Sequence, residues 1–160
     1  MNIIPLMQQG FASSSKRVAK MAENFVGDEA FFRPYDNVNH LAWEIGHLSF
    51  IRNTIIKLLN PAEKLDIYQN ERANFAPGTP IQPNEMYASI PEITAIFQKR
   101  GEKIIELLAN LTQEHWDAES PFKLPFGTTI GSQIWTFFMH ESFHLGEISY
   151  LKNIVVRNKG

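Results

Sequence analysis

Hydrophobic residues recur at intervals of three and four along four segments of the chain, which is the spacing of one face of an α-helix. This pattern predicts helices over residues 6–26, 38–60, 84–111 and 128–156. No segment shows the convincing alternation of apolar and polar residues that is typical of a half-buried β-strand. In the second segment the apolar positions are Leu41, Ile45, Leu48, Ile51, Ile55, Leu58 and Leu59.

Capping residues and prolines mark the ends of these segments. Asn84 is expected to cap the third helix, and Thr128 or Thr129 the fourth, because their side-chain oxygens can accept hydrogen bonds from first-turn amides. Pro61 directly follows the second helix, which it cannot continue. Pro91 is expected either to end a first short turn or to open the main part of the third helix.

The connection over residues 61–83 is longer than a turn between antiparallel neighbours requires. Its roughly 23 residues could extend about 75 Å, twice the length of helices that measure roughly 30–40 Å. Each helix has only an apolar stripe, so it must bury that stripe against partners. We therefore predict an all-α protein with a single domain of residues 1–160, folded as a four-helix bundle whose second and third helices run parallel through a long crossover.

Composition and charge exclude several classes of protein. The 15 Lys+Arg and 17 Asp+Glu residues give a net charge of −2, which provides no broad positive surface for nucleic acid or an anionic membrane. The apolar stretches fall far short of the roughly 18 residues that a membrane span requires, and the N-terminus lacks the pattern of a secretory signal. The absence of Cys excludes disulfides, thiolate metal sites and a cysteine nucleophile. We expect a cytoplasmic protein in which His and carboxylates supply any metal ligands.

His140 and His144 lie four residues apart in the fourth predicted helix. This spacing stacks the two imidazoles one turn apart on the same face of the helix. It is the spacing of a two-histidine metal clamp. Two histidines with separate hydrogen-bond partners are the alternative, and the spacing alone does not decide between them.

Three other histidines are placed less distinctively. His47, in the second helix, is flanked by core residues and is either a hydrogen-bonded core residue or a third ligand. Gly46 before it costs about 1 kcal/mol relative to Ala inside a helix, which indicates close packing or room for something bulky. His40 is expected to start the second helix, and His115, beside Trp116, to be a surface or packing residue.

Two motifs stand out in the second and fourth predicted helices. They read Asn39-x3-Trp43-x2-Gly46-His47-Leu48, and Phe126-Gly127-Thr128-Thr129-Ile130-Gly131 followed by His140-x3-His144-x-Gly146. Together they resemble the motifs of a known family, the DinB/YfiT-like metalloenzymes: the first corresponds to that family's W-x-x-G-H element and the second to its H-x3-H-x-G element. The likeness extends over the whole chain, because length, four helices and the long second connection all fit.

This resemblance implies an up-down-down-up bundle, often a homodimer, that holds a divalent metal ion, usually Zn²⁺ or Ni²⁺. The implied ligands are His47, His140 and His144. Family members with an assigned chemistry are mostly metal-dependent thiol transferases or isomerases, which use low-molecular-weight thiols such as bacillithiol or mycothiol, and many others have no known activity. Glu147 stands where many relatives have Gln or another uncharged residue, and it is either a partner of an imidazole or exposed.

Three neutral imidazoles leave a divalent ion at least one open coordination position, as catalytic sites do. Our hypothesis is a site that activates a thiol cosubstrate for attack on a small electrophile at the mouth of the bundle. One alternative is a ferritin-like di-iron protein, because Glu44-x-x-His47 and Glu141-x-x-His144 are both E-x-x-H motifs. That site would leave His140 unused, and the first helix offers it only Glu23. A non-catalytic metal-binding or structural helical dimer is the other alternative.

The remaining candidates have ordinary structural interpretations beside the functional ones. Glu44 either accepts a hydrogen bond from a ligand histidine or faces solvent. Trp43 is expected in the core, although its place four residues before His47 also suits the wall of a pocket. Residues 98–106, rich in Lys and Glu, are expected to form a solvated face. No pattern selects a catalytic residue. Three further aromatic residues are expected in the core: Trp135, Phe137 and Phe138.

Overall fold

The computed structural model describes residues 3–159, which form helices and no β-strand. This confirms the predicted all-α fold class. Residues 1, 2 and 160 of the predicted domain lie outside the described residues. The four long helices are α1 (Ile4–Ala22), α2 (Leu41–Leu59), α4 (Ile90–Ala109) and α6 (Ile130–Arg157). The short ones are η1 (Gly27–Phe31), α3 (Glu71–Phe75), η2 (Asn84–Met86) and α5 (Gln113–Asp117).

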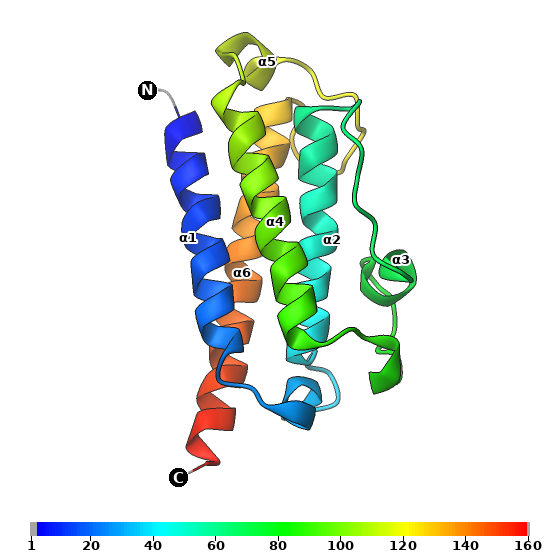
Figure 1. Cartoon of the computed structure of the whole chain (residues 1–160). Coiled ribbons are helices and arrows are strands. Elements are labelled where there is room, and N and C mark those ends of the chain that lie inside the picture. Colours follow the sequence, from blue (N-terminus) through cyan, green and yellow to red (C-terminus); the bar gives the residue numbers. More distant parts are fainter. Residues whose placement is uncertain (1–2, 160) are drawn as a thin grey trace.

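The four long helices lie side by side as a bundle with the predicted up-down-down-up order (Figure 1). In this view α1 and α6 run downward, whereas α2 and α4 run upward. Because α2 and α4 are parallel, the chain must return along the bundle between them. It does so through the crossover of residues 60–89, which carries α3 and η2 on the outer side of α2.

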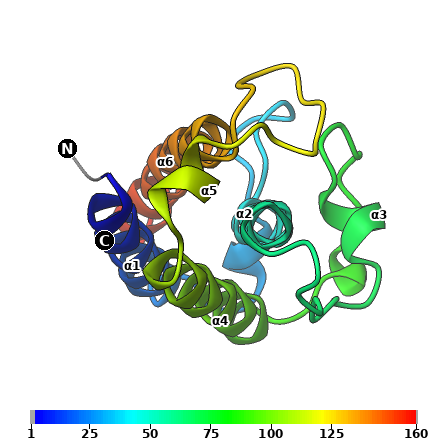
Figure 2. The ribbon, with the colours of Figure 1, turned by 90° about the horizontal axis from the view of Figure 1, so that it is seen from above.

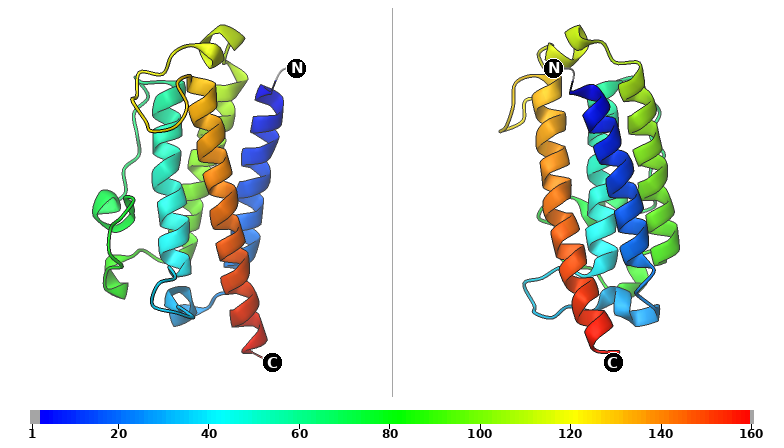
Figure 3. Two further views of the ribbon diagram at one scale, coloured as in Figure 1. Left: turned by 180° about the vertical axis from the view of Figure 1, so that it is seen from behind. Right: turned by 90° about the vertical axis from the view of Figure 1, so that its left-hand side faces the viewer.

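Helix α2 lies at the centre of the molecule, between α4, α6 and the crossover (Figure 2). The view from behind shows α6 lying beside α2 along most of the length of α2 (Figure 3). As a result α2 has no solvated face, and its polar residues Glu44, His47, Arg52 and Asn53 are buried together with its apolar ones. Buried polar groups need partners inside the protein, so α2 is the helix around which a polar site can be built.

The starts of α2 and α6 agree with prediction. His40 caps α2, since its Nδ1 accepts a hydrogen bond from the backbone N–H of Trp43 at 3.1 Å. Thr129 caps α6 by accepting from the backbone N–H of Ser132 at 3.2 Å. These caps satisfy amides that have no partner within the helix.

The predicted start of the third long helix was wrong. Asn84 lies in η2, and α4 begins six residues later, at Ile90, with Ser89 as its cap. Pro91 occupies the first turn of α4, where its missing N–H group costs no helical hydrogen bond. Pro91 therefore opens the main helix, and the other predicted helix ends agree with the structure to within four residues.

A polar layer contributed by all four long helices divides the hydrophobic core into two clusters. At its centre the guanidinium of Arg52, fully buried, forms a bidentate ion pair with Glu141, through Nε at 3.0 Å and Nη2 at 2.7 Å. The hydroxyl of Ser14 donates to the same carboxylate. A Cβ at Gly101 would lie 2.5 Å from Arg52 Nη1, so a glycine there makes room for the guanidinium.

Two predictions about the surface need correction. Arg100, within the predicted solvated face of residues 98–106, is buried and paired with Glu71 of the crossover. Trp135, expected in the core, is 44% exposed, whereas Phe137 is buried and Phe138 half-buried against Gly10 and Phe11. Within residues 3–159, no helix is both long enough and apolar enough to span a membrane.

Candidate metal centre

Three histidine side chains converge between α2 and α6. His47 comes from α2, and His140 and His144 from successive turns of α6. The Nε2 atom of His140 lies 3.4 Å from Nε2 of His47 and 3.1 Å from Nε2 of His144. One ring nitrogen from each histidine lies within 4.8 Å of those of the other two, close enough for one ion to contact all three.

Hydrogen-bond acceptors behind two of the rings fix their orientation. The Nδ1–H group of His47 donates to the carbonyl oxygen of Phe75 at 2.8 Å. The Nδ1–H group of His144 donates to Oε2 of Glu44 at 2.5 Å. A carbonyl and a carboxylate only accept, so they leave the Nε2 atom of each ring free on the side that faces His140. Nδ1 of His140 has no partner within the described chain.

The residues predicted to surround the ligands lie at this site. Trp43 is buried and stacks on His47, with ring centroids 4.6 Å apart and planes 8° from parallel, so it belongs both to the core and to the wall of the site. Glu44 is 1% exposed, which decides its role in favour of the hydrogen bond to His144. Glu147 is half-exposed, and its Oε2 lies 2.8 Å from Nδ1 of the same histidine.

Gly46 has the tight packing that its position in mid-helix predicts. A Cβ at this position would lie 2.1 Å from Cε1 of Phe75, so the ring occupies the space of the missing side chain. Glycine therefore allows the crossover to approach α2 closely enough for the carbonyl of Phe75 to reach His47.

Sequence reasoning did not find Phe75, because residues 61–83 read as a loop. Phe75 acts through its main-chain oxygen, and a main-chain oxygen leaves no signal in the choice of side chain. The glycine before His47 was the available hint.

The di-iron alternative is not assembled by residues 3–159. Glu141 is engaged in the buried ion pair with Arg52. Neither group of potential metal ligands in the described chain contains Glu141, or a glutamate of α1 or α4. The described ligands therefore favour the three-histidine site.

Burial and neighbouring charges shift the pKa values of the three imidazoles in different directions. Burial, together with the neighbouring His144 and His47, lowers the pKa of His140 to about 4. Burial also lowers the pKa of His47. At His144, burial acts in the same direction, but the Glu44 and Glu147 carboxylates outweigh it and raise the pKa above its ordinary value. Without metal, His144 is therefore the first of the three imidazoles to take up a proton as the pH falls.

This division predicts how Zn²⁺ affinity depends on pH. Near pH 6.5, His47 and His140 are mostly neutral because their pKa values are lowered, whereas His144 is mostly protonated because its pKa is raised. One proton then competes with the metal, so the affinity is expected to rise about tenfold per pH unit. Competition titrations against a chelator measure this slope. A clearly steeper dependence would show instead that His47 and His140 are protonated together with His144.

A second group of potential ligands shares His144 with the first. Glu44 and Glu147 both face Nδ1 of this histidine, on the side of the ring away from His140. Burial and the repulsion of Glu44 raise the pKa of Glu147. Oxygen ligands suit Mg²⁺, Ca²⁺ or Mn²⁺, whereas imidazoles suit Zn²⁺ and Ni²⁺. The two groups thus predict different metals.

Fold and site together define a class: a helical bundle with three convergent imidazoles able to hold one divalent metal ion. The site suits a divalent metal ion because the Nδ1 atoms of His47 and His144 are occupied by hydrogen bonds, which leaves their Nε2 atoms free to bind it. The family model of the DinB superfamily matches residues 11–148, and the chain belongs to this superfamily.

One solved structure supports the fold independently. A protein described as the conserved protein of locus from Enterococcus faecalis is similar over 98% of each chain, with a TM-score of 0.65 and 15% sequence identity. At this identity the likeness shows the fold alone. A comparison with curated proteins finds no match.

Proposed function

We propose that His47, His140 and His144 bind one Zn²⁺ or Ni²⁺ ion, and that the protein is a metal-dependent enzyme acting on small electrophiles with a low-molecular-weight thiol as cosubstrate. The reaction class is S-transfer or isomerisation. The observation that carries the proposal is the convergence of three imidazoles in a member of the DinB superfamily, with Nε2 of His140 3.4 Å from that of His47 and 3.1 Å from that of His144.

The chain's own residues prepare the site for this chemistry. Glu44 and the carbonyl of Phe75 orient two imidazoles, and the stacked Trp43 shields His47 from water. A divalent ion, when bound, supplies a Lewis acid that lowers the pKa of a thiol or of water. Because the chain has no Cys, the thiol must come from a cosubstrate. Such a thiol stays reduced in the cytoplasm, where we propose that the protein acts.

An assay of the metal-loaded protein tests the proposed activity. Protein loaded with Zn²⁺ or Ni²⁺ is mixed with bacillithiol or mycothiol and an electrophile such as monobromobimane. A rate well above that of the His144→Ala variant supports the proposal, and His115→Ala, which alters a histidine outside the site, should match wild type. Metal binding without any such rate would favour the second candidate, a non-catalytic metal-binding dimer.

One observation favours a dimer in either case. Helix α6 presents four exposed apolar side chains along one side, Trp135, Met139, Phe143 and Tyr150, with Phe143 72% exposed. Large apolar side chains gathered on one exposed side of a helix are typical of an interaction surface. Because these four side chains are uncharged, two copies related by a two-fold axis would pair them without repulsion. We therefore propose a homodimer formed through this α6 stripe.

Introducing a charge into the stripe tests the dimer. Phe143→Glu is expected to convert the dimer into a monomer at micromolar concentration, because pairing would bury two like charges at the interface. Light scattering coupled to size-exclusion chromatography measures the mass. A wild-type protein that is already monomeric, or a variant that remains dimeric, would contradict the proposed interface.

A further inference from the structure

The short helix α3 lies against the metal centre although it contributes no ligand. Its last residue, Phe75, is buried, and the carbonyl oxygen of this residue accepts the Nδ1–H bond of His47 at 2.8 Å. With five residues, α3 has little more than one turn and is too short to be stable by itself. Its position must therefore be set by contacts with the bundle.

At its C-terminal end, α3 is fixed by the packing of an aromatic ring. The ring of Phe75 lies directly on Gly46, where a Cβ would approach Cε1 to 2.1 Å, and its centroid lies 5.7 Å from that of Tyr87. The amide of Asn74 also donates to the carbonyl of Met86 at 2.7 Å. The approach of α3 to α2 thus depends on the glycine next to the ligand His47.

At its N-terminal end, α3 is fixed by a buried charge. Glu71 forms an ion pair with Arg100 of α4, and the amide of Asn53 on α2 donates to Glu71 Oε2 at 3.3 Å. Arg100 Nη1 donates in turn to the carbonyl of Ser49 on α2 at 2.9 Å. Because a buried charge without its partner is strongly destabilising, this cluster holds Glu71 in one place between two long helices.

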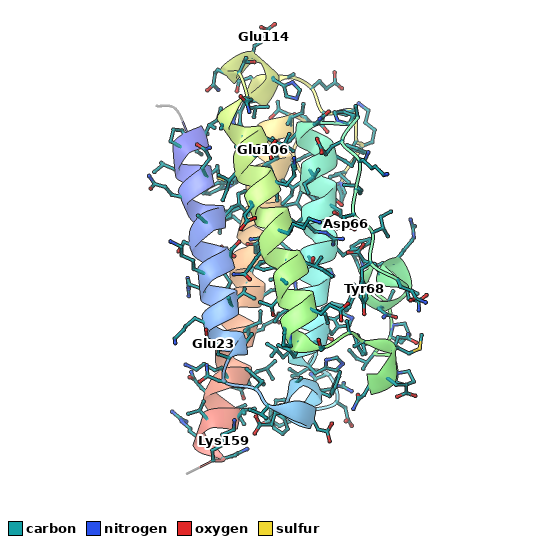
Figure 4. All side chains as sticks on the ribbon, viewed as in Figure 1. Glu23, Asp66, Tyr68, Glu106, Glu114 and Lys159 are labelled. Atoms are coloured by element: carbon teal, nitrogen blue, oxygen red, sulfur yellow. The ribbon has the colours of Figure 1, made fainter. Side chains whose placement is uncertain are left out.

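The same arginine also holds the segment that leads into α3. Its Nη2 donates to the carbonyl oxygen of Asp66, whose side chain pairs with Lys99 of α4 at 2.7 Å. Figure 4 marks Asp66 and Tyr68 on this part of the crossover, beside α4. The crossover is thus attached to α4 from residue 66 to residue 71, directly before the turn that carries Phe75.

We propose that Glu71 and Arg100 are positioning residues for the metal centre, acting through α3. They hold the carbonyl of Phe75 where it keeps His47 in the Nδ1–H tautomer, with Nε2 facing His140. The long crossover is then part of the site and more than a connection between parallel helices. This inference rests on the proposed metal site, and it gives a functional reason for Gly46.

A matched pair of glycine substitutions tests the proposal in the metal-free protein. Gly46→Ala should displace Phe75, whereas Gly146→Ala adds the same methyl to α6 where no atom lies within 4 Å. At pH 7.5 the lowered pKa of His47 keeps the ring neutral, so ¹⁵N NMR reports its tautomer. We expect one tautomer in wild type and Gly146→Ala, and a mixture in Gly46→Ala, together with a loss of Zn²⁺ affinity of about 10–100-fold.

Glu71→Gln extends the test to the buried charge. This variant keeps the shape of the side chain but removes the ion pair with Arg100, and we expect the same change of tautomer and affinity. If this variant does not fold, Gly46→Ala decides the question. A folded Gly46→Ala protein in which His47 keeps a single Nδ1–H tautomer would overturn the inference. A tautomer change in a protein whose wild type binds no metal would instead contradict the proposed function and support the positioning of His47.

Discussion

Replacing His144 by alanine is expected to lower the affinity for Zn²⁺ by more than 100-fold. Substitutions of outer hydrogen-bond partners already cost about 10–100-fold at such sites, and this one removes a ligand. It also removes the donor through which Glu44 and Glu147 act on the site. Zn²⁺ at about 1,000 times its dissociation constant stabilises a protein by about 4 kcal/mol, which for this chain length raises Tm by roughly 10 °C. The variant should lose most of that rise.

Thermal unfolding with and without Zn²⁺ measures this effect. His115→Ala is the matched control, because His115 lies in α5 at the end of the bundle and belongs to neither group of potential ligands in the described chain. It should keep the full rise in Tm. An equal rise in His144→Ala and in the control would show that the stabilising metal binds elsewhere.

Replacing Arg52 by methionine is expected to lower the free energy of unfolding by about 3–5 kcal/mol. The substitution leaves the carboxylate of Glu141 buried, with the Ser14 hydroxyl as its remaining side-chain partner. It also removes the contact between the guanidinium and the ring of Phe97, whose centroid lies 3.4 Å from Cζ. Since whole domains are stable by only about 5–15 kcal/mol, this loss is large. Urea unfolding of the metal-free protein measures it.

A double variant distinguishes the loss of stability caused by breaking the ion pair from the loss caused by removing side-chain volume. Arg52→Met combined with Glu141→Leu removes both charges and fills the space with apolar groups, which is often neutral or stabilising. We expect the double variant to be clearly more stable than Arg52→Met alone. Lys123→Met, which breaks the exposed pair with Glu119, should leave the unfolding midpoint nearly unchanged. A double variant as unstable as the single one would contradict the role assigned to the ion pair.

Periodicity predicted the long helices because each of them buries a stripe against the bundle, and that burial constrains the residue types. Helix α2 shows the limit of this reasoning. It is buried on all sides, so Glu44, Arg52 and Asn53 interrupt its apolar pattern without marking a solvated face. Likewise Arg100 follows Lys99 in a charged segment, and only the arrangement of the crossover shows that one is buried and the other exposed.

The site could be predicted to the extent that side-chain identity carries it. The resemblance to the DinB/YfiT-like family, carried by the motif around His47 and by His140-x3-His144, selected three imidazoles that the structure brings together. The partners that orient them were less visible: Glu44 had two open interpretations, and Phe75 contributes a main-chain oxygen from a segment that reads as a loop. Gly46 was the one residue whose unfavourable helix propensity pointed to that contact.

X-ray absorption of the protein loaded with one equivalent of Zn²⁺ tests the central claim most directly, because it counts the ligands of the bound ion. Coordination by Nε2 of His47, His140 and His144 predicts three imidazole nitrogens at about 2.0–2.1 Å and one exchangeable oxygen ligand from water. The three-imidazole signal should be lost in the His47→Ala variant. His47 belongs to the three-histidine group and not to the group of Glu44, His144 and Glu147, so the variant distinguishes the two groups. A spectrum with one imidazole and carboxylate oxygens, unchanged in His47→Ala, would contradict the three-histidine centre.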